Sequence, residues 1–393
     1  MAAEANRIDD MEPQQFRIRT RDGRAQLAGQ VDLPSLGTST ARYPVVLMVP
    51  GGWFMDRDGY MGGSGTEGDL IYRDLAADLL AAGVAVVRYD NRGVRCNEMT
   101  MPPCRQGSSE AEVSRHYLSA CVDADVRQTV TVQTQRDDVE DVWAFAVSHP
   151  RLDPTRALIW AHSEGGLNVA RLIGRGRIHP RGAQFVGAIT ESPSSVFRWQ
   201  TVERYVEHMM GWDEDGDGRV TPSDVQRRFP GDPMFAAVGM AQEVLAAPSE
   251  GWTQETLRDR FAAEYEKMKA AAFAKPDDAP YPDPWPEFRM VAASNNWWKQ
   301  WFVDETPLID HLAEYRGQAS FHIGEIDSQN PGRRQLAFGE GRVAAGLFAR
   351  PPRLVWHQGR GHSLRTAEPA MGPMDEGAKA CLVAEARQVL SAG

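Results

Sequence analysis

Short apolar runs alternate with longer amphipathic stretches over most of the chain. The runs have the length and the branched and aromatic residues typical of buried strands. They cover residues 15–20, 26–34, 44–52, 84–93, 157–163, 185–193, 319–327 and 353–359. Between them, apolar residues recur at helical spacing, notably over 69–83 and 135–150. This alternation predicts an α/β fold with a mainly parallel central sheet flanked by helices.

Two long stretches interrupt the alternation. Residues 94–121 are polar and predict a long loop. Residues 194–317 predict a large helical cap inserted into a core made of 1–193 and 318–393. The sequence therefore predicts one core domain that carries a second, helical domain.

The expected cap is rich in tryptophan. Trp297, Trp298 and Trp301 are candidates to line an apolar pocket for a bulky or aromatic group. Packing in the cap's own core is the commoner use of such side chains, and we favour it for most of them.

The charge balance narrows the class of partner. The chain has 43 Lys and Arg against 54 Asp and Glu, a net charge of −11, and no run of basic residues. This composition disfavours nucleic acid and anionic membrane surfaces as partners. No apolar run reaches the roughly 18 residues that a membrane helix requires. We expect a small-molecule partner, and the sequence leaves the oligomeric state open.

The cellular compartment is also left open. The N-terminus has no charged-then-apolar signal pattern, so the protein is either cytoplasmic or, with a signal removed, secreted or periplasmic. Cysteines occur at Cys96, Cys104, Cys121 and Cys381. A bridge between Cys96 and Cys104 and a set of free thiols are both compatible with this spacing.

A serine lies where a strand turns sharply into a helix. The turn is Ala161-His162-Ser163-Glu164-Gly165, and its small residues allow the two backbones to pass close together. Such a turn exposes the serine at a helix N-terminus, where N–H groups face developing negative charge. The simpler alternative is a serine that only caps the helix.

Three further segments follow apolar strands in a fixed order. They are VPGGWFMDRDG at 49–59, HIGEIDSQNP at 322–331 and WHQGRGHSL at 356–364. With the turn, which resembles the G-x-S-x-G nucleophile elbow with Ala161 in place of the first glycine, they make the core similar to the α/β-hydrolase family. The resemblance covers about 40–193 and 318–390 and does not extend to the cap.

The resemblance implies roles for particular residues. Ser163 is the expected nucleophile, Asp327 the acid and His362 the general base, in the chain order of this family. The expected oxyanion donors are the N–H of Gly52 or Trp53 together with the N–H of Glu164.

Each of these roles has a rival. Glu325 lies two residues before Asp327 on the same face of an extended strand, and we favour Asp327 because the end of the strand is freer to reach the site. His357 lies within a strand, and His162 should point away from the serine. Asp90 and Arg92, in RYDNRG, are expected to brace a loop.

These residues predict a serine hydrolase that cleaves an ester, thioester or lactone through an acyl-enzyme intermediate. A serine peptidase or amidase of the same fold is one alternative. A non-enzymic, calcium-dependent interaction protein is another. No nucleotide or redox cofactor is expected, because the phosphate-binding glycine motifs are absent from the sequence.

The cap contains a second motif, WDEDGDGRVTPSDV. The expected ligand positions of an EF-hand loop fall on Asp213, Asp215, Asp217, Arg219, Thr221 and Asp224. The match over 213–224 predicts a structural Ca²⁺ ion, with Mg²⁺ as an alternative because position twelve is aspartate rather than glutamate. The competing interpretation is a solvated acidic turn before a helix capped by Thr221. No second loop of this kind occurs, which disfavours a calcium sensor.

Overall fold

A computed structural model describes residues 13–35, 42–60, 70–96, 102, 110–230, 232, 245–279, 293–366 and 372–391. The chain divides into two compact units. Unit 1 comprises Met1–Arg127, Val132–Thr190 and Leu308–Gly393, and unit 2 comprises Gln128–Thr131 and Glu191–Pro307. Unit 2 ends at Pro307 rather than at 317 because Leu308–Leu312 (η5) packs on a helix of unit 1 and Ile309 N–H donates to the carbonyl of Thr190.

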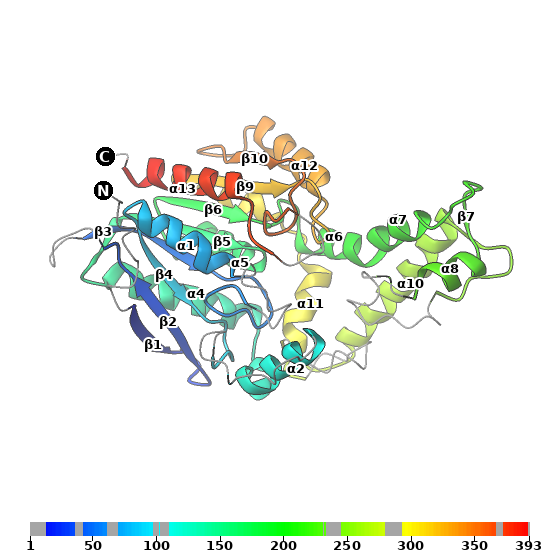
Figure 1. The fold of residues 1–393 in the computed structure, drawn as a ribbon, viewed down its shortest axis with the longest axis horizontal. Helices are drawn as coiled ribbons and strands as arrows, with labels where there is room; N and C mark the ends of the chain where they lie inside the picture. The colour runs from blue at the N-terminus through cyan, green and yellow to red at the C-terminus, as the bar shows by residue number, and fades with distance from the viewer. Residues whose placement is uncertain are drawn as a thin grey trace, which may run out of the picture. The chain divides into compact units, whose positions relative to one another are not determined.

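The centre of unit 1 is an eight-stranded sheet with the order β1-β2-β4-β3-β5-β6-β9-β10. The strands are β1 Gln14–Arg19, β2 Gln26–Asp32, β3 Tyr43–Val49, β4 Ala85–Tyr89, β5 Leu152–His162, β6 Gly182–Val186, β9 Gln318–Gly324 and β10 Arg353–His357. Strands β1 and β2 pair antiparallel, β2 pairs antiparallel with β4, and the remaining pairs are parallel. The predicted fold class is confirmed (Figure 1).

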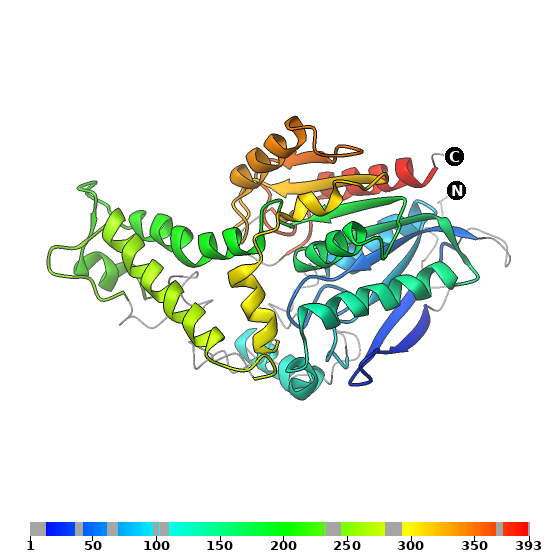
Figure 2. The same ribbon diagram turned by 180° about the vertical axis from the view of Figure 1, so that it is seen from behind.

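Helices cover both faces of this sheet. Those of unit 1 are α1 Ile71–Ala81, α2 Glu110–Cys121, α3 Ala124–Arg127, α4 Val132–Ser148, α5 Glu164–Gly174, α12 Gly332–Ala344 and α13 Glu376–Ser391. Alternate residues of a strand point to opposite faces. Val46 and Met48 therefore share one core with α1 and α13, whereas α4 and α5 pack on the other face (Figures 1 and 2).

The expected loop at 94–121 is partly helical. Helix α2 forms over Glu110–Cys121 because Tyr117 and Cys121, four residues apart, bury the same helix face. Arg95 N–H donates to the carbonyl of Cys121, and Cys96 forms a disulfide with Cys121. Neither alternative left open by the sequence, a Cys96–Cys104 bridge or a free thiol, therefore holds for Cys96. Cys104 lies outside the described residues, and Cys381 is a free thiol.

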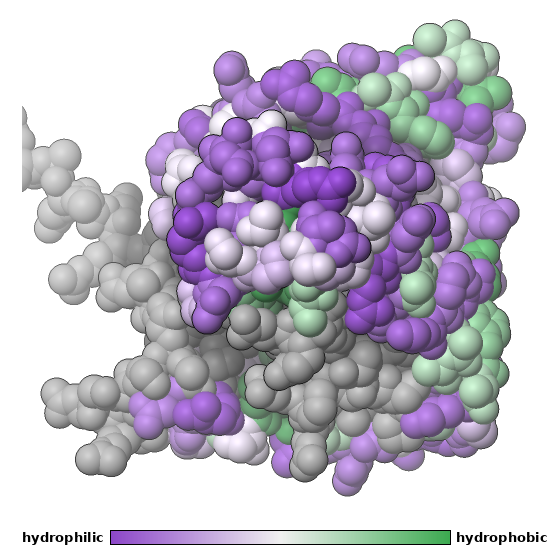
Figure 3. Space-filling view, turned by 90° about the vertical axis from the view of Figure 1, so that its right-hand side faces the viewer, coloured by the Kyte–Doolittle hydropathy of each residue, from purple (hydrophilic) through white to green (hydrophobic). Residues whose placement is uncertain are grey.

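Unit 2 is mainly helical. Its elements are α6 Pro193–Arg198, η3 Trp199–Glu203, α7 Arg204–Met210, β7 Arg219–Val220, α8 Pro222–Arg228, β8 Trp252–Thr253, α10 Gln254–Phe273 and α11 Asn295–Val303. Strands β7 and β8 form a short antiparallel ribbon. On the side of β7 and α8 its surface is mostly hydrophilic (Figure 3).

The tryptophans of α11 belong to the core of unit 2. Trp298 and Trp301 pack beside Phe197 in that core, and Trp297, which is buried, stacks edge-on against both. This placement agrees with the core use that we favoured over a pocket lining. In the described part of the chain, no helix has the length and apolar character of a membrane span.

Candidate active site

The 161–165 elbow joins β5 directly to α5. Ser163 lies between them at φ 50° and ψ −122°, a conformation that non-glycine residues adopt only where the surroundings enforce it. Its N–H donates to Val186 of the neighbouring strand. A Cβ on Gly165 would lie 2.4 Å from the carbonyl oxygen of Pro50, so only glycine fits there. These constraints hold Ser163 at the carboxyl edge of the sheet, at the start of a helix.

His362 reaches the serine from the loop after β10. Its Nε2 lies 3.0 Å from Ser163 Oγ, and the histidine is buried. Gly187, at φ +59°, follows β6 directly beneath this loop, and a Cβ there would lie 2.3 Å from the carbonyl oxygen of His362. Close approach of the two loops therefore requires glycine at this position.

Asp327 reaches the other side of the same imidazole from the loop after β9. Its carboxylate oxygens lie 3.1 and 3.0 Å from His362 Nδ1. The backbone N–H groups of Gln329 and Asn330 donate to Asp327 Oδ1, each at 2.8 Å, which fixes the carboxylate. Because a carboxylate only accepts, Nδ1 of His362 carries the proton and Nε2 presents its lone pair to Ser163.

The rival residues lie elsewhere. Glu325 pairs with Arg333 and accepts the N–H of Gly359. His357 Nε2 lies 3.0 Å from Nδ1 of His322. The structure thus brings together the three residues favoured from the sequence, whereas Glu325 and His357 pair with other residues. The His162 ring lies edge-on to that of His362, with 5.4 Å between the ring centroids.

The 50–60 loop lies against the elbow. A Cβ on Gly51 would lie 3.3 Å from Ser163 Cβ, and one on Gly52 would lie 2.3 Å from Glu164 Oε2. Trp53 has φ 67°, a left-handed conformation that non-glycine residues rarely adopt. Within the described part of the chain, the N–H of Gly52 has no hydrogen-bond partner. The residues expected to donate to an oxyanion are therefore gathered beside Ser163.

Comparisons with known proteins agree with this architecture. No protein-family model and no curated protein matches this sequence. Among solved structures, the α/β-hydrolase GrgF from Penicillium sp. sh18 superposes with a TM-score of 0.50 at 16% identity, covering 97% of this chain and 100% of its own. An esterase from Thermogutta terrifontis, with malate bound, gives 0.46 at 14% identity over 96% of this chain and 100% of its own. The chain has the α/β-hydrolase fold.

Buried ion pairs brace the loops of this α/β-hydrolase fold. The Arg57 guanidinium binds both carboxylate oxygens of Asp90, at 2.9 and 2.6 Å, and the Arg57 N–H donates to the same carboxylate. Arg92 binds Asp138 in the same two-pronged way, at 2.9 and 2.6 Å. Asp90 and Arg92 thus fasten loops, as expected from the sequence, and neither is a member of the Ser163 group.

Several residues that complete the site carry no local signal in the sequence. Asn330 donates its side-chain amide to the carbonyl of Gly187, and Tyr72 accepts the N–H of Gly51. Both contacts join segments far apart in the chain, so no motif could have indicated them.

The acidic loop of unit 2 brings together three of its expected ligands. Carboxylate oxygens of Asp213, Asp215 and Asp217 lie within 4.8 Å of one another. Asp224 lies outside this group, because its carboxylate accepts from Thr221 and pairs with Arg227 at the start of α8. The Arg219 N–H donates to Asp217.

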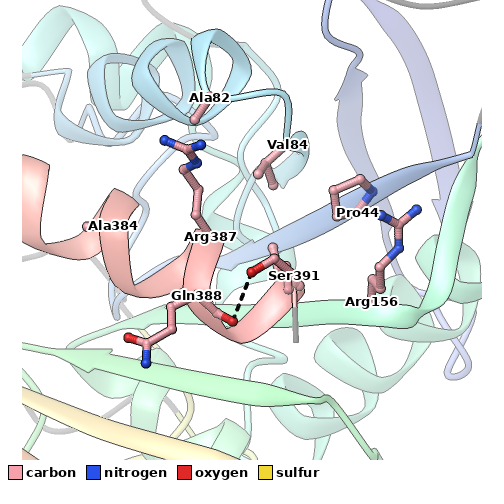
Figure 4. A pocket seen from close by; sticks show the side chains of 9 residues that line it. Pro44, Ala82, Val84, Arg156, Ala384, Arg387, Gln388 and Ser391 are labelled. Atoms are coloured by element: carbon pink, nitrogen blue, oxygen red, sulfur yellow. Dashed lines mark hydrogen bonds between the residues drawn. The ribbon is translucent and has the colours of Figure 1, made fainter. Parts of the chain in front are cut away.

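A surface groove lies away from these residues. It is lined by Pro44, Ala82, Val84, Arg156, Ala384, Arg387, Gln388, Leu390 and Ser391 (Figure 4). Pro44 and Val84 stand at the amino ends of β3 and β4, whereas Ser163 follows the carboxyl end of β5. The groove is therefore at the opposite edge of the sheet from the Ser163 group.

A second histidine cluster bridges β9, β10 and α13. His322 Nε2 lies 3.0 Å from a carboxylate oxygen of Glu385, and its Nδ1 faces His357. Since the carboxylate only accepts, His322 donates to Glu385 from Nε2. Burial, followed by the neighbouring His322, lowers the pKa of His357 to about 4.

This lowered pKa makes stability depend on pH. The unfolded chain binds a proton at His357 near its ordinary pKa of about 6.5, before the folded chain does. The stabilising contribution is therefore complete above that value and is lost as the pH falls toward 4. His357→Gln keeps a hydrogen-bonding group beside His322 and removes the titration. We expect the wild type to take up about one more proton on unfolding near pH 5 than this variant. Urea unfolding at pH 7, 6 and 5 measures the difference, and parallel curves for the two proteins would refute it.

Proposed function

We propose that the protein is a serine hydrolase that cleaves an ester, thioester or lactone through an acyl-enzyme intermediate. One observation carries the proposal: Ser163 Oγ, the His362 imidazole and the Asp327 carboxylate form a continuous hydrogen-bonded row, with contacts of 3.0 Å between serine and histidine and 3.0 Å between histidine and aspartate. A row of this kind activates a hydroxyl that is otherwise a weak nucleophile.

The reaction follows from these contacts. His362 Nε2 takes the Ser163 proton while Oγ forms a bond to the acyl carbon, and Asp327 stabilises the resulting imidazolium. As the tetrahedral intermediate collapses, the bond to the leaving group breaks and His362 returns the proton to that group. A water molecule then attacks the acyl carbon while His362 takes its proton. The bond between Oγ and the acyl carbon breaks, His362 returns the proton to Oγ, and the acid product leaves.

The negative charge that develops on the acyl oxygen needs N–H donors. We assign one to Glu164, at the N-terminus of α5, and the other to Gly52, with Trp53 as the alternative. The position of Gly52 against Glu164 and its unengaged N–H among the described residues favour Gly52. Such donors lower the barrier most when they are held in place before reaction.

The proposed substrate is a small acyl compound. The net charge of −11 argues against nucleic acid as a partner. Trp298 and Trp301, which suggested a bulky or aromatic group, pack against the core of unit 2 and therefore give that preference no support. The Cys96–Cys121 disulfide favours an oxidising compartment, and we propose secretion or the periplasm on that ground.

Labelling with a fluorophosphonate tests the proposal without knowledge of the substrate. The reagent adds covalently only to an activated serine, so we expect intact-mass analysis to show one adduct, which peptide mapping assigns to Ser163. Ser163→Ala should give none, whereas Ser195→Ala, a change outside the row, should label as the wild type does. Absence of an adduct on the folded wild type would refute the proposal. A panel of esters and amides then separates an esterase from a peptidase.

We further propose that the 213–224 loop binds Ca²⁺ as a structural ion, with Mg²⁺ as the alternative. Three carboxylates within 4.8 Å of one another supply the oxygen ligands that these ions prefer. The N–H groups of Gly216 and Gly218 donate to Asp213 and shape the loop around them. Asp224 fits less well, since it would have to leave Thr221 and Arg227 to join the other ligands.

Calcium should therefore raise the melting temperature of the wild type. Stabilisation should grow by about 1.4 kcal/mol for each tenfold excess of free ion over the dissociation constant. Asp215→Asn combined with Asp217→Asn should abolish this response, whereas Asp259→Asn, an acid on α10, should retain it. Thermal unfolding in calcium, magnesium and chelator measures it. Equal melting temperatures in all three would exclude a bound ion.

A further inference from the structure

A chain of hydrogen bonds runs behind Ser163 and connects three segments of the site. Tyr72 on α1 accepts the N–H of Gly51 at 3.0 Å. The Tyr72 hydroxyl also lies 3.0 Å from His162 Nδ1, and His162 Nε2 lies 3.0 Å from Ser363 Oγ. Gly51 precedes Gly52, and Ser363 follows His362. The chain thus joins the loop of the proposed oxyanion donor, the elbow and the loop of the proposed base.

All the side chains of this row are buried. Tyr72 is 1% exposed, His162 3% and Ser363 7%. The Tyr72 and Trp160 rings enclose the His162 imidazole, which stacks on Trp160 with an interplanar angle of 6°. Water therefore has little access to the row, and each polar atom depends on its partner in the protein.

The chemistry of the groups fixes the direction of each bond. The Tyr72 oxygen already accepts from Gly51, so its one hydrogen is free to donate. It has two neighbours, Met55 Sδ at 2.6 Å and His162 Nδ1, and an imidazole nitrogen is the stronger acceptor. Burial, followed by the charges of His362 and Arg365, holds the pKa of His162 well below its ordinary value. Neutral His162 then carries its hydrogen on Nε2 and donates it to Ser363.

We propose that Tyr72, His162 and Ser363 are positioning residues. They fix two loops relative to Ser163: the 50–60 loop, which carries the proposed oxyanion donor, and the loop after β10, which carries His362. They act through their neighbours. Tyr72 acts through Gly51 and Ser363 through the adjacent His362. His162 acts through the adjacent Ser163 and through the His362 ring, which it meets edge-on with 5.4 Å between the centroids. The inference rests on the proposed function. It assigns a role to His162, the histidine that the nucleophile's own strand presents on the face opposite to Ser163.

Removing one hydroxyl of the row by substitution should lower the rate of the chemical step without weakening substrate binding. Tyr72→Phe keeps the ring and removes the hydroxyl, and Ser363→Ala removes the other end of the row. We expect each to lower kcat for a 4-nitrophenyl ester about tenfold with KM unchanged, the size of effect that one hydrogen bond exerts on a barrier. The rate of fluorophosphonate labelling should fall in parallel. Tyr315→Phe, which loses a hydrogen bond to Pro180 far from Ser163, is the matched control and should keep both rates.

The double variant separates positioning from packing. His162 joins Tyr72 to Ser363, so Tyr72→Phe with Ser363→Ala should cost clearly less than the hundredfold product of the single effects. In a His162→Asn background, whose amide lies at the position of Nδ1 and cannot reach Ser363, the coupling should vanish. Circular dichroism confirms that each variant is folded.

The outcomes distinguish this inference from the proposed function. Wild-type protein without a fluorophosphonate adduct would overturn the hydrolase itself. A wild type that labels at Ser163, with Tyr72→Phe and Ser363→Ala labelling equally fast, would overturn only the positioning row. Strictly multiplicative effects of the two substitutions would also overturn it, because independent packing defects behave in that way.

Discussion

Asp327→Asn should lower kcat for ester hydrolysis by about four orders of magnitude while the protein remains folded. The Asp327 carboxylate accepts from His362 Nδ1 and so keeps the Nε2 lone pair directed at Ser163. An asparagine amide can donate to Nδ1 instead, which moves the imidazole hydrogen to Nε2. The histidine would then face the serine with a donor and could not take its proton. Steady-state rates with a 4-nitrophenyl ester, together with thermal unfolding, measure the effect.

Glu325→Gln is the matched control. Glu325 is the nearest acidic neighbour in the sequence, but its carboxylate binds Arg333 and the N–H of Gly359. Glutamine retains an acceptor for that N–H, so we expect rates within about twofold of the wild type, as for a surface change remote from the chemistry. A large loss in Glu325→Gln with normal rates in Asp327→Asn would reverse the assignment of the acid.

Asp90→Ala should lower the free energy of unfolding by about 3–5 kcal/mol. Asp90 and Arg57 have side chains only 1% and 9% exposed, and two bonds join the guanidinium to the carboxylate. Removing the acid deprives the buried Arg57 cation, in the 50–60 loop, of its paired carboxylate and leaves its hydrogen bond to Gln15. Urea unfolding at neutral pH measures the loss. Glu203→Ala breaks a pair with Arg258 whose side chains are 32% and 41% exposed, and it should cost at most about 1 kcal/mol.

A double substitution tests whether the unpaired charge of Arg57 causes the loss of stability in Asp90→Ala. Asp90→Leu combined with Arg57→Met removes both charges and keeps apolar volume, so it should be more stable than Asp90→Ala. If the double variant were the less stable of the two, the loss would come from packing rather than from the unpaired charge.

The parts of this molecule that could be predicted are those with a local cause. The apolar run that ends at Ala161 and the small residues around Ser163 specify a strand, a sharp turn and a helix, and β5 and α5 follow that pattern. Asp327 and His362 could be chosen because each follows a strand where the family that the core resembles has its acid and base, in the chain order of that family.

The errors have physical reasons too. The polar residues around 110–121 led to the prediction of a loop, but this segment forms a helix that buries only one face, through Tyr117 and Cys121. The disulfide partner of Cys96 depends on the backbone pairing of Val94 with Val122, a contact that spacing along the chain does not encode. Asp224 stays a predicted ligand that was chosen by its position in the motif, and its carboxylate forms the capping box of α8 with Thr221.

The hydrogen bond between Ile309 N–H and the carbonyl of Thr190 has a consequence for how this protein can vary. The two residues stand at either end of the Glu191–Pro307 segment, and β6 pairs with β9 just outside it. The sheet of unit 1 is thus continuous although the chain leaves it for this segment. For unit 1, the Glu191–Pro307 segment is one closed loop. The entropy of closing a loop rises only with the logarithm of its length, so doubling the segment would cost about 0.6 kcal/mol. Length changes at this junction are therefore inexpensive for the core, and a different segment can be grafted between Thr190 and Leu308 while β6 and β9 stay paired.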